Sequence, residues 1–203
     1  AEYAVVPATN VFLIPSQLSY QEAAALPTVY LPAWNILVRQ AQLKPSEHCL
    51  VLSASSGVGS AGIQVAKNVV GANCIATTST VEKAELARTL GADHVILHDA
   101  PDFKEQIMEF TLGHGIDVVL DHVGARFYEP AFNSLHRGGR YGICGVTAGY
   151  KVELHMGRLF TQSLHVFGVY MGTKEDMKNI VHFASNGTIK GVVGSTYQLD
   201  DIA

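Results

Sequence analysis

A short apolar run leads directly into a cluster of small residues, and this junction constrains the fold more than any other part of the chain. The run Cys49–Ala54 is followed by Ser55–Gly62, which opens an apolar segment with helical periodicity. The order predicts a strand, a tight turn and a helix. Small residues let backbone N–H groups approach a ligand, and a helix N-terminus carries about half a positive charge. The junction therefore predicts a turn that holds the pyrophosphate of a dinucleotide.

From about residue 45 onward, short apolar runs alternate with helical patterns. This alternation predicts a Rossmann-type α/β domain with a doubly wound, six-stranded parallel sheet, because parallel neighbours need crossovers that cover both faces. The expected strands are Cys49–Ala54, Cys74–Thr78, Val95–His98, Val118–Asp121, Tyr141–Val146 and Val166–Tyr170. The expected helices are Val58–Val70, Val81–Leu90, Phe103–Phe110, Phe127–Leu135, Met156–Gln162 and Glu175–Ser185.

The two ends of the chain follow a different pattern and show no complete core of their own. We therefore expect the chain to be a fragment of a longer polypeptide. The elements expected at the ends are strand-like Glu2–Val6 and Val192–Leu199, extended Val11–Pro15, and helical Tyr20–Ala25 and Ala33–Gln40, separated by Pro27 and Pro32.

Composition narrows the class of protein and of partner. Of the 203 residues, 48% are hydrophobic and 16% are charged, which is typical of a well-cored globular protein. The net charge of −4 and the scattered lysines and arginines argue against nucleic acid or a membrane surface as a partner. No apolar run approaches the ~20 residues of a membrane span, and we expect a cytoplasmic protein. Cys49, Cys74 and Cys144 are expected to be buried, reduced thiols.

The turn departs from the G-x-G-x-x-G pattern, since Ala54, Ser56 and Gly59 occupy the three glycine positions and Gly57 is additional. Taken alone, the pattern is also compatible with a tight strand-to-helix turn that binds nothing.

The residues after the second expected strand bear on the choice of cofactor. NAD sites place a carboxylate roughly 20 positions past the glycines to accept the ribose hydroxyls. Here Thr78, Ser79 and Thr80 stand there instead, and Lys83 follows. Hydroxyl and ammonium groups suit a 2′-phosphate that a carboxylate would repel, so NADP(H) is favoured over NAD(H). The alternative is that Thr78–Thr80 simply caps a helix that carries an exposed lysine.

Five motifs follow one another along the whole chain: Glu22–Thr28, the Ser-Gly-Val-Gly-Ser turn, Leu90–Val95, Asp117–Gly124 and Gly138–Gly142. Together they resemble the medium-chain dehydrogenase/reductase superfamily, most closely its quinone oxidoreductase-like and zinc-type alcohol dehydrogenase-like members.

The resemblance implies a division of the chain into three parts. Residues 1–40 would be the end of a GroES-like catalytic domain with its connecting helices, 41–190 the NAD(P)-binding domain, and 191–203 the start of a return to the catalytic domain. The zinc alcohol dehydrogenases of the family carry a zinc-ligating cysteine near the Ala-Ala-Leu-Pro stretch, but Leu26–Thr28 offers none. Zinc is thus not supported by this segment, and no metal ligand is assigned.

The resemblance also implies a set of cofactor-binding positions, all near the carboxyl ends of strands. They are Thr28 near the nicotinamide; Ser56, Gly57 and Val58 at the pyrophosphate; Thr78, Ser79 and Lys83 at the 2′-phosphate; His98 beside the adenine; and Val123, Gly145, Val146, Tyr170 and Met171 along the nicotinamide half.

No catalytic proton donor is assigned, although three alternatives were weighed. His122, beside Asp121, either contacts the nicotinamide ribose or a substrate, or is a structural histidine. Tyr170 and Lys174 have the Tyr-x-x-x-Lys spacing of short-chain dehydrogenases, but Gly172 argues against a shared helix. Ser55 approximates a nucleophile elbow, for which Asp121 and His155 would complete a hydrolase triad.

These observations predict an NADP(H)-dependent oxidoreductase that transfers hydride between a nicotinamide and a quinone, enone, carbonyl or alcohol. A zinc-dependent alcohol dehydrogenase of the same superfamily and a non-catalytic NADPH-binding module are the alternatives. The resemblance further implies a homodimer, because Leu164–Tyr170 is an apolar strand expected at the sheet edge. The substrate is expected to be a small molecule.

Overall fold

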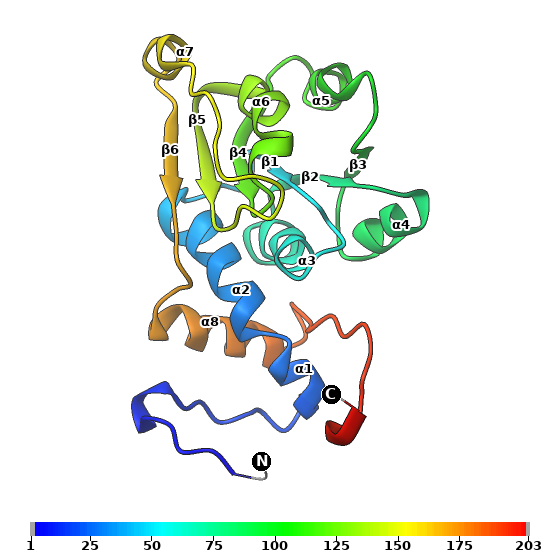
Figure 1. Ribbon diagram of the computed structural model, residues 1–203, viewed down its shortest axis with the longest axis vertical. Helices are drawn as coiled ribbons and strands as arrows, with labels where there is room; N and C mark the ends of the chain where they lie inside the picture. Colours follow the sequence, from blue (N-terminus) through cyan, green and yellow to red (C-terminus); the bar gives the residue numbers. More distant parts are fainter. Residues whose placement is uncertain (1–2, 202–203) are drawn as a thin grey trace.

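A six-stranded parallel sheet forms the centre of the computed structural model, which describes residues 3–201 (Figure 1). The strands lie in the order β3-β2-β1-β4-β5-β6, and every neighbouring pair is parallel. The predicted doubly wound Rossmann-type sheet is therefore confirmed. The strands are β1 (His48–Val51), β2 (Asn73–Thr78), β3 (His94–Leu97), β4 (Ile116–Asp121), β5 (Leu135–Ile143) and β6 (His165–Gly168).

Helices connect the strands and cover both faces of the sheet, so each face buries its own apolar core. One core is formed with α2, α3 and α8, and the other with α5 and α6. The helices are α1 (Tyr20–Ala24), α2 (Pro27–Trp34), α3 (Gly57–Gln64), α4 (Val81–Thr89), α5 (Phe103–Phe110), α6 (Ala125–Asn133), α7 (Met156–Thr161) and α8 (Lys174–Ser185). The π-helical segments η2 (Asn35–Gln40) and η3 (Val65–Val70) extend α2 and α3, while η1 (Ala8–Asn10) and η4 (Leu199–Asp201) are single 3₁₀ turns.

The central strands β1 and β4 explain why the apolar runs in the sequence are nearly continuous. Cys49–Leu52 and Val118–Leu120 have no exposed surface, because helices cover both of their faces. Cys74 is also fully buried, and Cys144 is half-buried, so the expectation of buried thiols is largely confirmed.

Two proline and glycine signals were misread in the sequence. Pro32 does not interrupt the helix but lies buried inside α2, where packing against α3 and α8 outweighs the lost hydrogen bond. Gly138 and Gly139 were expected to precede the fifth strand, which instead begins at Leu135 and runs through them. The positive φ of Gly138 and a register shift opposite Ile116–Val118 accommodate the irregularity within the strand.

The ends of the chain differ from the expectations in another way. Val192–Leu199 was expected to be a strand, but it runs as an irregular segment that ends in η4. No described strand lies beside it, and a strand without a ladder partner leaves its backbone groups unpaired. Residues 3–6 likewise form no strand, and Glu2 lies outside the described residues. Val11–Pro15, which was expected to be extended, belongs to no helix or strand. Within residues 3–201, no helix has both the length and the apolar character to cross a bilayer.

Candidate cofactor site

The turn between β1 and α3 lies where the strand order reverses. β2 and β3 lie on one side of β1, and β4, β5 and β6 lie on the other, so the connections from β1 and β4 leave the sheet in opposite directions. In open α/β sheets, ligands bind at the carboxyl edge of this switch point. Because all six strands are parallel, the segments that follow them also meet at this edge.

The backbone of the turn is arranged to leave donors free at the helix end. Ser53 has a φ of 54°, and the Ala54 N–H donates to the Thr77 carbonyl oxygen at 2.7 Å. Ser56 is the N-cap of α3, and its Oγ accepts from the Gly59 N–H at 2.9 Å. Gly57 and Val58 stand in the first turn of the helix, where N–H groups have no intrahelical acceptor. These two groups are therefore suited to hold an anion.

The two glycines of the turn have different roles. A Cβ on Gly59 would lie 2.1 Å from the backbone oxygen of Ser53, so this residue lets α3 approach the end of β1. A Cβ on Gly57 would lie 2.5 Å from Cγ1 of Val29 in α2, and Gly57 itself is exposed. The turn thus combines close helix-to-strand packing with an open backbone surface, as a phosphate-binding turn requires.

His122 supports this turn from the neighbouring strand. Its Nε2 lies 2.8 Å from Ser56 Oγ and 3.1 Å from the Leu52 carbonyl oxygen. Because that carbonyl can only accept, we assign the proton to Nε2. Burial lowers the pKa of His122, whereas the Asp121 carboxylate opposes the shift. A neutral His122 therefore joins the end of β4 to the N-cap of α3, which favours the structural role over an acid–base role.

Both carboxylate oxygens of Asp121 accept hydrogen bonds within the protein, from the loop that follows it and from β5. Its Oδ1 accepts from the N–H groups of Val123 and Gly124 at 2.6 and 2.9 Å, and its Oδ2 accepts from the Tyr141 hydroxyl at 2.9 Å. Burial raises the pKa of Asp121, and these hydrogen bonds oppose the rise. His155 instead accepts from the Arg158 N–H at the start of α7. The side chains weighed for a hydrolase triad with Ser55 therefore have separate structural partners.

The loops after β4 and β5, which the resemblance assigns to the nicotinamide half of the cofactor, pack directly against each other. The Ala148 N–H donates to the Val123 carbonyl oxygen at 2.7 Å. A Cβ on Gly145 would lie 2.7 Å from the His122 carbonyl oxygen, and one on Gly124 would lie 3.0 Å from the Cα of Val146. Val123, Gly145 and Val146 therefore lie together at the carboxyl edge of the sheet.

The segment after β6 reaches the same region from the other side. Met171 has a φ of 53°, and its carbonyl oxygen accepts from Asn35 Nδ2 at 2.9 Å. Sequence reasoning missed Asn35, although a polar residue within an apolar helical segment was a signal for such a contact. Tyr170 is 94% exposed and precedes the helix that begins at Lys174, so the two residues do not share a helix face. Thr28 is exposed on α2, next to the Val29 that faces Gly57.

The positions assigned to the 2′-phosphate divide into buried and exposed groups. Thr78 is buried, and its hydroxyl has no hydrogen-bond partner among the described residues. Ser79 and Lys83 are exposed, and Lys83 Nζ donates to Ser79 Oγ at 3.2 Å. Thr80 caps α4 by accepting from the Lys83 N–H, so the capping interpretation of this stretch is also correct in part. Ser79 and Lys83 thus present a hydroxyl and an ammonium group to solvent.

His98 lies next to the same region, packed on an aromatic ring. The rings of His98 and Phe127 are 4.4 Å apart between centroids, and the Arg126 guanidinium lies 5.1 Å from the centre of the Phe127 ring. Burial lowers the pKa of His98, and the charges of Arg126 and Lys83 add to this effect. Sequence reasoning missed both Arg126 and Asp99, which pair at 3.4 Å. The surroundings of His98 therefore carry two cations, Lys83 and Arg126, and one carboxylate, Asp99.

The chain matches a known protein family over most of its length. The family model described as zinc-binding dehydrogenase matches residues 57–186, which is well over half of the chain and includes α3, β2 to β6 and α8. The chain belongs to this zinc-binding dehydrogenase family. With the sheet described above, it is a nucleotide-binding domain of the medium-chain dehydrogenase/reductase superfamily.

Individual members of the superfamily resemble the chain over nearly its full length. Quinone oxidoreductase-like protein 2 from Bos taurus is 28% identical over 100% of this chain and 60% of its own length. The crystal structure of an NAD-dependent alcohol dehydrogenase has a TM-score of 0.91 and 38% identity over 96% of this chain and 56% of that one. A mycobacterial protein solved in complex with NADPH has a TM-score of 0.82 and 26% identity, over 91% of this chain and 59% of its own. This zinc-binding dehydrogenase family domain therefore spans somewhat more than half the length of such relatives.

Among the described residues, the positions assigned to the nicotinamide half contain no group of converging metal-ligand side chains. Within residues 3–201, the one group of three histidine or carboxylate side chains with converging ligand atoms comprises His48, His114 and Asp117. This group lies at the amino ends of the strands, across the sheet from the cofactor edge. We therefore assign no step at the nicotinamide to a metal held by these residues.

Proposed function

We propose that the chain is the cofactor-binding part of an NADP(H)-dependent oxidoreductase, which transfers hydride between the nicotinamide and a quinone, enone, carbonyl or alcohol. The observation that carries the proposal is the turn at Ser56–Val58, which presents free N–H groups on a helix N-terminus at the switch point of the sheet. The cofactor supplies the hydride chemistry when it is bound. The residues of this chain hold the pyrophosphate and shape the wall beside the nicotinamide.

The preference for NADP(H) rests on the residues that follow β2. Ser79 and Lys83 present a hydroxyl and an ammonium group where an NAD site has a carboxylate, and Arg126 lies in the same region. The relatives divide on this point, since one is named NAD-dependent and another was solved with NADPH. The positive charges at the adenosine end favour the phosphorylated cofactor.

Titration of the purified chain with NADPH and NADH, followed by nicotinamide fluorescence, tests the site. We expect Gly57→Asp to weaken NADPH binding at least about tenfold, because its side chain would collide with Val29 and its carboxylate would add negative charge at the helix end that holds the pyrophosphate. Gly194→Asp is the matched control, since a Cβ there meets open space and it lies in the irregular segment after α8. Failure of the wild-type chain to bind either nucleotide would remove the proposal.

The choice of nucleotide is tested separately with Lys83→Ala. We expect the affinity for NADPH to fall about tenfold and the affinity for NADH to stay the same, because the ammonium group meets only the 2′-phosphate. Lys104→Ala, another exposed lysine at the start of a helix, is the control. Unchanged NADPH affinity in Lys83→Ala would overturn the 2′-phosphate assignment while leaving the pyrophosphate turn intact. Cofactor binding without turnover of quinones, enones or alcohols would favour the non-catalytic module.

A further inference from the structure

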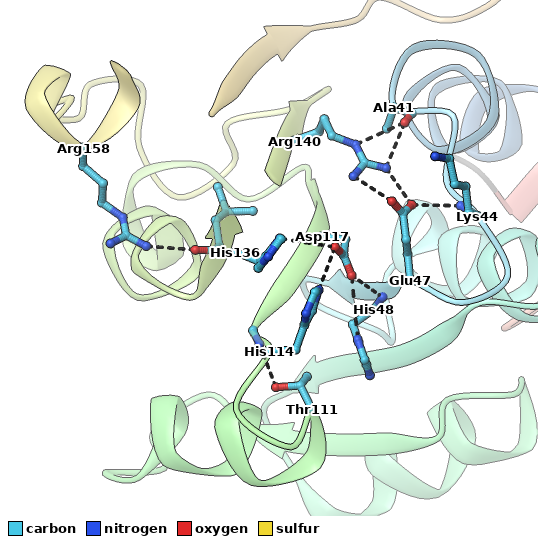
Figure 2. A network of polar contacts seen from close by, with 12 residues as sticks. Ala41, Lys44, Glu47, His48, Thr111, His114, Asp117, His136, Arg140 and Arg158 are labelled. Carbon is cyan, nitrogen blue, oxygen red and sulfur yellow. Dashed lines mark hydrogen bonds and ion pairs between the residues drawn. The ribbon is translucent and has the colours of Figure 1, made fainter. Parts of the chain in front are cut away.

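Three histidines surround a buried aspartate at the amino edge of the sheet, away from the cofactor site (Figure 2). His48 is the first residue of β1 and Asp117 is the second residue of β4. The register that pairs Cys49 with Val118 makes these two residues direct neighbours. His114 comes from the turn before β4, and His136 is the second residue of β5.

The ligand atoms of three of these residues converge. His114 Nε2 lies 3.0 Å from Asp117 Oδ1, and His48 Nδ1 lies 3.7 Å from Asp117 Oδ2. One ligand atom from each of the three residues lies within 4.8 Å of the other two. A tetrahedral metal site with bonds of 2.0–2.1 Å places neighbouring ligand atoms about 3.3 Å apart. Small side-chain rotations would therefore bring all three atoms to one ion.

His48 has a buried ring nitrogen that the hydrogen-bond network leaves without a partner among the described residues, which suggests a place for a ligand. Its Nδ1 is buried and has no hydrogen-bond partner within residues 3–201, since 3.7 Å to the carboxylate is too long. The His48 backbone N–H already donates to Asp117 Oδ2 at 2.9 Å, which holds the carboxylate in place.

The surroundings would orient the ligands and admit an ion. The ring of His136 stacks on that of His114, with 4.0 Å between centroids and 19° between planes. This contact fixes the orientation of the His114 imidazole. The side chain of His114 is 42% exposed, while that of Asp117 is 9% exposed. The cluster is thus open to solvent on the histidine side and anchored on the carboxylate side.

We propose that His48, His114 and Asp117 bind a divalent transition-metal ion of the Zn²⁺ type, with solvent in the remaining position. Two imidazole nitrogens and one carboxylate oxygen are ligands that suit such ions, whereas Mg²⁺ and Ca²⁺ prefer oxygen ligands throughout. The site joins the starts of β1 and β4 and would stabilise the folded chain when it is occupied. It shares no residue with the proposed cofactor site.

Calorimetric titration of the chelator-treated chain with ZnCl₂ and with MgCl₂ tests the site. We expect one Zn²⁺ per chain, no comparable Mg²⁺ binding, and a rise in the melting temperature with Zn²⁺. His114→Ala should weaken Zn²⁺ binding at least about a hundredfold, because it removes a direct ligand. His182→Ala, which removes an exposed histidine on α8, should bind as the wild type does.

Two further measurements keep the outcome clear. The circular dichroism of metal-free His114→Ala should match that of the wild type, since the side chain lies in an exposed turn. Bound Co²⁺ should show the visible absorption of a low-coordinate nitrogen and oxygen site, and His48→Gln should abolish it. Absence of Zn²⁺ binding by the wild-type chain, or equal loss in His114→Ala and His182→Ala, would overturn the proposal. Neither result would bear on nucleotide binding, which is measured without added metal.

Discussion

His122 shows how a single side chain can hold the turn between β1 and α3 in position. Its imidazole bridges the Leu52 carbonyl oxygen and Ser56 Oγ, so the end of β4 is tied to the N-cap of α3. Ser56 Oγ in turn accepts from the Gly59 N–H. The protonation of His122 therefore affects the turn on which the pyrophosphate would rest.

The burial of His122 makes the stability of the folded chain depend on pH. The pKa of His122 in the folded chain lies below the usual value of 6.5, so the unfolded chain binds more protons between those two values. The free energy of unfolding should fall as the pH is lowered through 6.5, with a slope of at most about 1.4 kcal/mol per pH unit for this group.

Urea unfolding measured between about pH 5.5 and 7.5 checks this prediction. His122→Gln should show a shallower decline than the wild type, because glutamine does not titrate. His182→Gln, which replaces an exposed histidine, should keep the wild-type slope. If the free energy of unfolding declines with falling pH at the same slope in the wild type and in His122→Gln, the prediction is wrong.

At the scale of elements, Arg140 joins β5 to the segment that enters β1 (Figure 2). Its guanidinium donates to both carboxylate oxygens of Glu47, at 3.0 and 2.7 Å, and to the Ala41 carbonyl oxygen. Glu47 also accepts from the Lys44 N–H at 2.9 Å. The Arg140 and Glu47 side chains are only 18% and 16% exposed, so solvent screens this bidentate pair weakly.

Arg140→Leu should therefore lower the free energy of unfolding by about 3 kcal/mol, because it leaves the Glu47 carboxylate without its partner in a largely buried position. Arg88→Leu is the matched control. Arg88 pairs with Glu85 on the exposed face of α4, and its loss should change stability by less than about 0.5 kcal/mol. Chemical denaturation of both variants measures the difference. Equal effects would show that the Arg140 pair contributes no more than a surface ion pair.

At the scale of the whole molecule, the fold was predictable because local signals and global topology agree. The apolar runs at Cys49–Leu52 and Val118–Leu120 predicted central parallel strands, and the small residues at 55–62 predicted the turn. The sequence did not show how packing would override Pro32, or that Val192–Leu199 has no described strand to pair with.

The clustering of side chains was less predictable than the order of elements. His48 and Asp117 are 69 residues apart, and only the pairing register of β1 with β4 makes them neighbours. His94 and His98 are only four residues apart in the sequence, yet they pack on Phe110 and Phe127 respectively.

The edge position of β6 supports the expectation of a homodimer. β6 pairs only with β5 among the described strands and forms an outer edge of the sheet (Figure 1). Val166 is partly exposed there, and an open apolar edge is a template for pairing with a second copy. We expect light scattering to give the mass of a dimer and Val166→Pro to give that of a monomer. Val152→Pro, in an exposed loop, should stay dimeric, and a monomeric wild type would exclude this pairing.

The glycines of the molecule differ in how far evolution can replace them. At Gly194 any side chain would project into open space, so drift at this position should be wide. At Gly57 the obstacle is the tip of the Val29 side chain, which a compensating change could remove. At Gly59 the obstacle is the main chain of Ser53 itself, and no second substitution can shorten a carbonyl group. Functional homologues should therefore vary freely at the position of Gly194. They should vary at the position of Gly57 only together with a change at Val29, and they should keep Gly59.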